Sequence, residues 1–188
     1  FLSFTMDTYD RRYFPTRGAQ VRLHGILHTD NGIRYDDDVP FGEVSLHAET
    51  AVRLAPKLYM LPSLKGRMLF GSNIPCIYQN CAGGPFDGNY LPWQMAWETA
   101  QHVHQLENNA VAARLAMRYR VKGKFYLTAL GEYGKEAHEI VHILRGNDLW
   151  GCALRASYDF VLGPISLQAN YSNLRKNVGF YLNAGFYF

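Results

Sequence analysis

The 188-residue sequence has no run of about 18 apolar residues, so it predicts no transmembrane helix, although 48% of its residues are hydrophobic. The net charge is only +3, which does not indicate a nucleic-acid-binding protein. Three cysteines are too few for a disulfide scaffold, although Cys76 and Cys81 are near enough in sequence to pair in an oxidising compartment. No secretory leader is visible at the start, so we expect a mature protein or a fragment.

Catalytic and metal-binding signatures are also scarce. The sequence has no G-x-S-x-G nucleophile elbow, and we predict no catalytic residue, metal or cofactor in this chain. Residues 138–142 read His-Glu-Ile-Val-His, which matches the H-E-x-x-H zinc motif, but that motif needs a helix and a third ligand, and the sequence indicates neither. His102 and His104, near Glu98 and Glu107, are likewise interpreted as solvated loop residues rather than a metal site.

Aromatic residues and period-two alternation are abundant. The chain has 13 Tyr, 11 Phe and 3 Trp, and membrane barrels carry such aromatics at both interfaces. Residues 150–162 alternate between an apolar face and a more polar one, and eight other segments do the same. These strands run to about 9–13 residues, enough to cross a bilayer at a tilt. The sequence therefore predicts an all-β fold, an antiparallel transmembrane β-barrel with about nine strands seen.

The polar faces of these strands are strongly charged, which suits a wet lumen. We favour an ion-pair network that stiffens a filled lumen, and a substrate path is the alternative. The charged residues are Arg53, Arg67, Arg114, Arg118, Arg120, Arg155, Glu49, Glu132 and Asp159. Most large aromatics are expected to anchor the barrel at the membrane interfaces. This group comprises Tyr13, Phe14, Trp93, Trp97, Trp150, Tyr158 and Phe188.

The connections alternate in length, as short periplasmic turns and longer external loops do. The turns expected on the periplasmic side are 10–18, 56–63, 122–124 and 163–164, and those expected outside are 28–42, 72–108, 134–149 and 173–177. This assignment of turns to the two sides of the membrane places the C-terminus at the periplasmic face. An odd number of strands is unusual for a complete bacterial barrel, so we expect an N-terminal part upstream.

The turn after the first strand carries a familiar motif. Asp7 and Asp10, followed by Pro15, Thr16, Arg17 and Gly18, resemble the strand-turn motif of the BamA/TamA superfamily of outer-membrane barrels, the bacterial surface antigen type. The resemblance implies a bacterial outer-membrane protein with a sixteen-stranded barrel. Residues 1–188 would be its C-terminal portion, with a long inward-folding external loop at 72–108. Phe180, Leu182, Phe186 and Phe188 resemble the terminal signal that the barrel-assembly machinery reads during biogenesis.

Within that superfamily, the loop and one later turn look nearest to barrels fused behind patatin-like phospholipase domains. The loop motif consists of Gly83, Gly84, Gly88, Asn89 and Tyr90. Asn89 stands where the assembly factors usually carry an arginine, which disfavours an assembly factor proper.

Three hypotheses follow for the function of the chain. It is the outer-membrane anchor of an upstream patatin-like lipid hydrolase, the barrel of a protein insertion or translocation factor, or a small self-contained structural barrel. The expected partners are outer-membrane lipid, the assembly machinery and the missing N-terminal domain.

Overall fold

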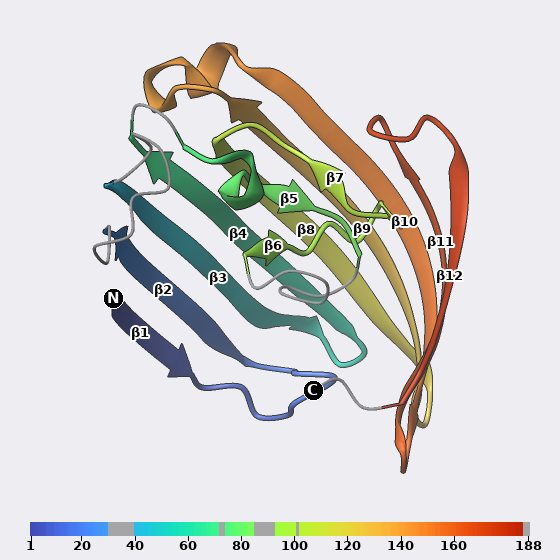
Figure 1. The fold of residues 1–188 in the computed structure, drawn as a ribbon. Helices are drawn as coiled ribbons and strands as arrows, with labels where there is room; N and C mark the ends of the chain where they lie inside the picture. Colours follow the sequence, from blue (N-terminus) through green and yellow to red (C-terminus); the bar gives the residue numbers. More distant parts are fainter. Residues whose placement is uncertain (30–39, 72–73, 85–92, 101, 186–188) are drawn as a thin grey trace.

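The computed structural model describes residues 1–29, 40–71, 74–84, 93–100 and 102–185. Its main sheet has nine strands, each antiparallel to the next along the chain (Figure 1). They are β1 (Leu2–Asp7), β2 (Gly18–His28), β3 (Phe41–Ala55), β4 (Leu58–Phe70), β8 (Asn109–Lys122), β9 (Phe125–Ala137), β10 (Asn147–Phe160), β11 (Gly163–Ser172) and β12 (Val178–Ala184). The described parts of β1 and β12 form the two edges and do not pair, so the sheet is open. The all-β prediction is confirmed, and sixteen strands stay a prediction.

Residues 71–108 join β4 to β8, and the described parts of this segment, 74–84, 93–100 and 102–108, lie in the concavity of the curved sheet (Figure 1). We call it the inserted segment. Its described parts hold the short 3-10 helix η2 (Cys76–Tyr78) and three two-residue strands, β5 (Cys81–Ala82), β6 (Gln94–Met95) and β7 (His104–Gln105). β5 pairs in parallel with β6 and antiparallel with β7. Strands this short cannot be recognised from alternation, because a period of two needs several residues to show.

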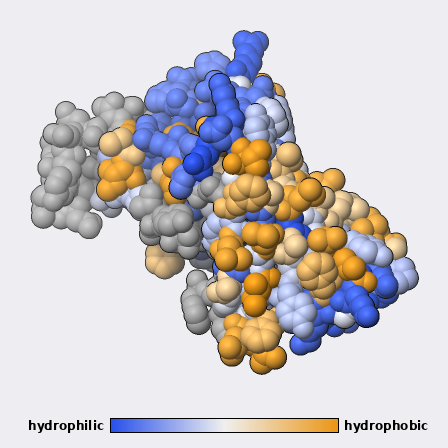
Figure 2. Space-filling model, turned by 90° about the vertical axis from the view of Figure 1, so that its right-hand side faces the viewer, coloured by the Kyte–Doolittle hydropathy of each residue, from blue (hydrophilic) through white to orange (hydrophobic). Residues whose placement is uncertain are grey.

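The two faces of the sheet differ as the alternation predicts. The convex face is apolar, and Leu154 on β10 and Leu182 on β12 are 67% and 69% exposed. The concave face carries the polar set, and Arg67, Ser157 and Gln168 are buried there. Figure 2 views the side of β11 and β12, where hydrophobic residues gather over the middle and the bottom, and hydrophilic residues gather at the top and at the lower right edge. An apolar outer surface of this extent suits contact with lipid hydrocarbon.

The ends of some strands differ from the prediction. The turn expected over 56–63 is only Pro56–Lys57, and β4 already begins at Leu58. Pro62 lies inside β4, where Leu61 and Pro62 have no register partner on β3, so the missing proline N–H breaks no ladder bond there. The turn expected at 163–164 is Val161–Leu162, because Gly163 and Pro164 already pair with β10.

The helical content is small. Besides η2 the described residues hold the 3-10 helix η3 (Ile140–Arg145), between β9 and β10. None of the described helices is long and apolar enough to span a membrane.

Leu154→Arg should cost about 2–4 kcal/mol of folding free energy, because it puts a charge on the lipid face near the middle of β10. The matched control is Tyr181→Arg. Tyr181 pairs with Gln168, which pairs with Arg155, so it lies at the same depth but on the concave face. Urea unfolding of the bilayer-folded protein measures both values. Equal costs for the two variants would show that the two faces are assigned incorrectly.

Candidate functional site

Residues 96–99 of the inserted segment are held by side chains from five strands of the main sheet, β4, β8, β9, β10 and β11. We call these four residues the anchor. Lys65 on β4 donates a hydrogen bond to the Ala96 carbonyl at 3.3 Å. Gln168 and Asn170 on β11 both donate to the Glu98 carbonyl. Charged residues of β8, β9 and β10 also contact the anchor, so the segment is tied to most of the concave face.

Glu98 forms the ionic centre of the anchor. Its carboxylate pairs with Arg114 of β8 and with Arg155 of β10. Arg114 also pairs with Glu49 of β3, which accepts a hydrogen bond from the Tyr9 hydroxyl at 3.1 Å. The Glu98 side chain is only 6% exposed, so both arginines lose water on one side when they reach it. A desolvated ion pair of this kind is strongly sensitive to the removal of one partner.

Glu132 of β9 holds the backbone of the anchor rather than its side chain. Its two carboxylate oxygens accept hydrogen bonds from the amides of Glu98 and Thr99, at 3.2 and 3.0 Å. Two otherwise orphaned backbone donors are thus satisfied inside the concavity. Glu132 lies near Lys65 and Arg114, which balance its charge. Three carboxylates and three cations therefore meet around the anchor: Glu49, Glu98, Glu132, Lys65, Arg114 and Arg155. Four residues of the predicted lumen network, Glu49, Glu132, Arg114 and Arg155, thus lie together here, whereas Glu98 and Lys65 were not predicted to belong to it.

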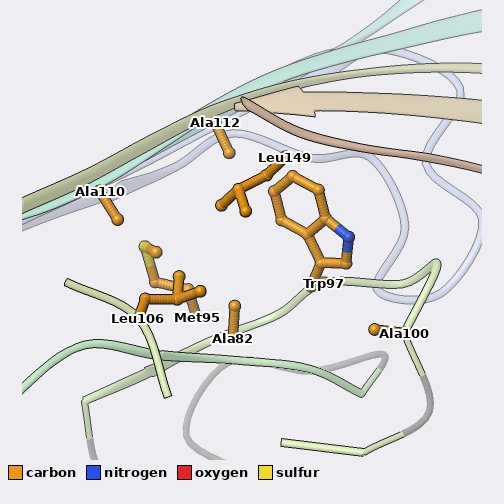
Figure 3. Close-up of a cluster of buried hydrophobic side chains, with 8 residues drawn as sticks. All are labelled: Ala82, Met95, Trp97, Ala100, Leu106, Ala110, Ala112 and Leu149. Carbon is orange, nitrogen blue, oxygen red and sulfur yellow. The ribbon is translucent and has the colours of Figure 1, made fainter. Parts of the chain in front are cut away.

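Trp97 supplies the apolar part of the anchor. It is 1% exposed and packs in a cluster with residues of the inserted segment and the sheet (Figure 3). The cluster contains Ala82, Met95, Trp97, Ala100, Leu106, Ala110, Ala112 and Leu149. The prediction that Trp97 anchors the barrel at the interface is wrong, because its ring fills the space between the inserted segment and β8 and β10. Trp150 and Tyr158, by contrast, are exposed on β10.

Two glycines allow close packing around the inserted segment, Gly83 within the segment itself and Gly151 where β10 meets it. Gly83 has φ +151°, and a Cβ there would lie 2.1 Å from the His102 carbonyl oxygen. A Cβ on Gly151 of β10 would lie 2.1 Å from the Thr99 hydroxyl oxygen. Larger residues at either position would force backbone apart, because atoms do not come this close.

A second set of contacts, around Arg67, fixes the start of the inserted segment. The Arg67 side chain is 2% exposed and pairs with Glu43 at 2.6 Å. It also donates to the Tyr78 carbonyl and the Asn80 amide oxygen, at 2.8 and 2.9 Å. The Asn80 amide nitrogen in turn donates to the Asn108 carbonyl at 2.9 Å. The first and last parts of the segment are thereby joined over β4.

A third set of contacts folds the β1–β2 turn over the other end of the concave face. Phe14 is buried and its ring stacks on Tyr126 of β9, with centroids 4.5 Å apart. Arg118 donates to the Pro15 carbonyl and lies 5.5–5.8 Å from the rings of Phe14, Tyr59 and Tyr126. Phe14 is therefore an interior residue and not the interfacial anchor that was expected. A guanidinium enclosed by aromatic rings keeps its charge through cation–π contacts.

Comparison with known proteins identifies the family. A family model described as OMP85 superfamily matches residues 1–188. The chain belongs to the OMP85 superfamily. Members of the superfamily are outer-membrane proteins, so this chain is an outer-membrane barrel chain of the BamA/TamA type. No match to this OMP85 chain was found among curated proteins.

The structure of the OMP85 chain describes only some residues of the strand-turn motif, the loop motif and the C-terminal signal. Asp7 accepts hydrogen bonds from the Tyr9 amide and the Gln20 side chain, which closes the end of β1. In the loop motif, the Gly84 amide donates to the Ala100 carbonyl at 2.7 Å. Gly88, Asn89 and Tyr90 lie outside the described residues. Phe180 and Leu182 are exposed on the apolar face of β12, and Phe186 and Phe188 lie outside the described residues.

The formal metal motifs do not form a site in the described part of this OMP85 chain. No group of three His, Cys, Asp or Glu residues there is arranged to hold a metal ion. His138 lies 3.5 Å from Glu107, whereas His142 lies 3.3 Å from Glu139, so the two imidazoles of the H-E-x-x-H stretch have separate partners. The three cysteines are free thiols, so Cys76 and Cys81 do not pair in this structure.

Asp10 should make the stability of the β1–β2 turn depend on pH. Burial alone would raise the pKa of its carboxyl, but hydrogen bonds from the Thr16 hydroxyl and from the amides of Thr16 and Arg17 outweigh burial and lower it from 3.8 to about 2. A lowered folded-state pKa contributes stability above the unfolded value, and this contribution disappears as pH falls toward the folded value.

We therefore expect wild type to be more stable than Asp10→Asn at neutral pH, with the difference shrinking as pH falls from about 4 to about 2. Urea midpoints of both proteins across this range provide the measurement. A difference that stays constant with pH would show that the carboxylate charge is not responsible.

Proposed function

We propose that this chain is the outer-membrane anchor of a larger protein, and that it anchors or displays an upstream patatin-like lipid hydrolase domain. The observation that carries the proposal is the occupied concavity. The inserted segment is tied by Glu98, Glu132 and Trp97 to most strands of the concave face. A wall that holds its own interior filled is suited to anchoring rather than to passing a large client through the lumen.

Two sequence features support the hydrolase as the upstream domain. The segment 83–94 and the turn 162–167 resemble those of barrels behind patatin-like domains. The chain itself contains no nucleophile elbow, so any hydrolysis has to come from another domain. In this proposal the nine strands form part of a sixteen-stranded barrel, and the C-terminus lies at the periplasmic face.

A second candidate is the barrel of a protein insertion or translocation factor of the BamA/TamA type. The superfamily match over residues 1–188 supports it, because that match does not separate the insertion factors from other members of the superfamily.

The test is to purify the polypeptide from its native membrane, weigh it intact and sequence it upstream of Phe1. A mass well above the 21.4 kDa of this chain, a G-x-S-x-G domain upstream and lipid hydrolysis that stops when its serine is replaced are the expected results. Upstream polypeptide-transport-associated repeats would select the insertion factor. A mass near 21.4 kDa would leave only the self-contained barrel.

A further inference from the structure

A further feature lies away from the anchor, at the end of the sheet where the short turns gather. Four turns lie there, along the lower and lower-right edge of Figure 1, and they join β1 to β2, β3 to β4, β8 to β9 and β10 to β11. The Arg120 amide donates to the Lys57 carbonyl at 2.8 Å, and the Asp159 amide donates to the Lys124 carbonyl at 2.9 Å. The last three turns are therefore neighbours. We call this end the turn rim, and it comprises residues 7–18, 53–58, 119–125 and 158–164.

The turn rim is strongly basic. It holds eight cations and three carboxylates, an excess of five positive charges. The two described connections between neighbouring strands at the opposite end, 135–148 and 173–177, together hold four cations and three carboxylates. The positive charge is thus concentrated at the turn rim. Its cations are Arg11, Arg12, Arg17, Arg53, Lys57, Arg120, Lys122 and Lys124, and its carboxylates are Asp7, Asp10 and Asp159.

Most of this charge is not used inside the protein. The described residues supply no side-chain partner for five of the eight cations, and all five are exposed: Arg11, Arg17, Lys57, Lys122 and Lys124. Arg53 donates to the carbonyls of Ala55 and Pro56, and Arg120 donates to that of Pro56. Carbonyl oxygens are neutral, so these hydrogen bonds do not cancel the charge of either guanidinium. The turn rim therefore presents positive charge to an anionic partner outside the described residues.

Aromatic rings border the turn rim on the convex face. Four of them are between 37% and 46% exposed: Tyr119, Phe125, Tyr158 and Phe160. Phe125 pairs with Tyr158, and Tyr119 pairs with Leu58, the residue after Lys57. Exposed rings at the edge of an apolar barrel face lie at the level of the lipid headgroups. Lys57, Lys122 and Lys124 are within three residues of these rings, so they are at headgroup depth as well.

We infer that the turn rim binds the phosphates of anionic phospholipids in the leaflet that surrounds it. Lys57, Lys122 and Lys124 are the principal contacts, because a lysine can lay its apolar stem along the aromatic border while its ammonium group reaches a phosphate. Clusters of lysine and arginine beside a membrane attract anionic lipids in this way. The position of the lysines next to the lipid face favours a lipid over an acidic protein domain.

The leaflet is a separate point, and it rests on the orientation given under the proposed function. With the turn rim in the periplasm, the phosphates belong to phospholipids of the inner leaflet. The binding itself does not depend on that orientation, because a symmetric vesicle offers the same lipid at both ends of the barrel.

The experiment places the full-length protein in phosphatidylcholine vesicles that contain phosphatidylglycerol. A bimane fluorophore is attached at Leu127→Cys, with all other cysteines replaced by serine. Leu127 is 46% exposed on the convex face and pairs with Tyr119, so it is close to the turn rim. Quenching by chain-brominated phosphatidylglycerol, compared with chain-brominated phosphatidylcholine, measures the local enrichment of the anionic lipid. We expect an enrichment of about threefold or more that disappears at 1 M salt, where the Debye length is about 3 Å.

The variants separate the turn rim from net charge. The triple variant Lys57→Gln/Lys122→Gln/Lys124→Gln should bring the enrichment close to one, and the corresponding triple lysine-to-arginine variant should retain it. The matched control, Arg145→Gln/Arg175→Gln/Lys176→Gln, removes three exposed cations at the opposite end and should leave the enrichment unchanged. Heat-modifiable migration on gels verifies that each variant is folded.

Equal quenching of the wild-type protein by the two brominated lipids would overturn the inference, as would an equal loss of enrichment in the glutamine variant and the control. Equal quenching together with protection of the three lysines from acetylation in lipid-free detergent would assign the turn rim to an acidic protein domain instead.

A membrane-impermeant maleimide applied to cells that carry Lys124→Cys tests the leaflet. Labelling only after the outer membrane is permeabilised is expected. Labelling of intact cells would overturn the inner-leaflet assignment and the proposed orientation, whereas the quenching result alone decides whether the turn rim binds anionic lipid.

Discussion

Replacing Glu98 with alanine is expected to detach the inserted segment from the sheet, at a cost of about 3–5 kcal/mol. The substitution removes the carboxylate that both Arg114 and Arg155 contact. It leaves two guanidinium groups in a poorly solvated place with one fewer counter-charge. The cost comes mainly from these uncompensated charges and not from the lost attraction, so replacing the whole cluster with apolar residues would cost less.

Limited proteolysis of the folded protein, with cleavage sites read by mass spectrometry, detects the release. Cleavage within residues 93–108 should become much faster in Glu98→Ala. The control is Glu107→Ala, in the same segment, because Glu107 is 43% exposed and its ion pair with His138 contributes little. If both variants are cut at the wild-type rate, Glu98 does not hold the segment.

Replacing Trp97 with alanine should cost about 3–5 kcal/mol as well, because it leaves a cavity in the cluster that joins the inserted segment to β8 and β10. Trp150→Ala is the control, because Trp150 is 45% exposed on the convex face and leaves no enclosed cavity. Urea unfolding in lipid measures both. A cost for Trp97→Ala no larger than that for Trp150→Ala would contradict the packing described.

The two substitutions should not be additive. Glu98 and Trp97 are neighbours in the anchor, and the segment can be released only once. The double variant should therefore cost less than the sum of the single variants. An additive result would mean that the ionic and apolar halves of the anchor act independently.

The strand faces could be predicted from the sequence because alternation is a local signal. Arg155 and Leu154 are adjacent, and their opposite faces follow from the pleat alone. Pro62 shows the limit of such local evidence. Proline is common in turns, but β4 continues through Pro62 because no residue of β3 pairs with that position and the missing N–H leaves no hydrogen bond unmade.

The anchor could not be predicted because its contacts join distant parts of the chain. Glu98 pairs with Arg155, and Glu132 accepts hydrogen bonds from the anchor amides. In each case the two partners are more than thirty residues apart in the sequence. The sequence does not distinguish a buried tryptophan such as Trp97 from one at the membrane interface, and only the tertiary structure separates the two cases. The pair Gly83-Gly84 was a usable signal, since glycines mark close backbone approach, but the sequence does not say to what.

The central claim is that the convex face meets lipid and the concave face meets the interior. Spin labels at Leu154→Cys and Tyr181→Cys, in protein with Cys76, Cys81 and Cys152 replaced by serine, test it most directly. The ratio of collisions with oxygen to collisions with a water-soluble nickel chelate should be much higher at position 154 than at position 181 in native membranes. Equal ratios, or a higher ratio at position 181, would contradict the account.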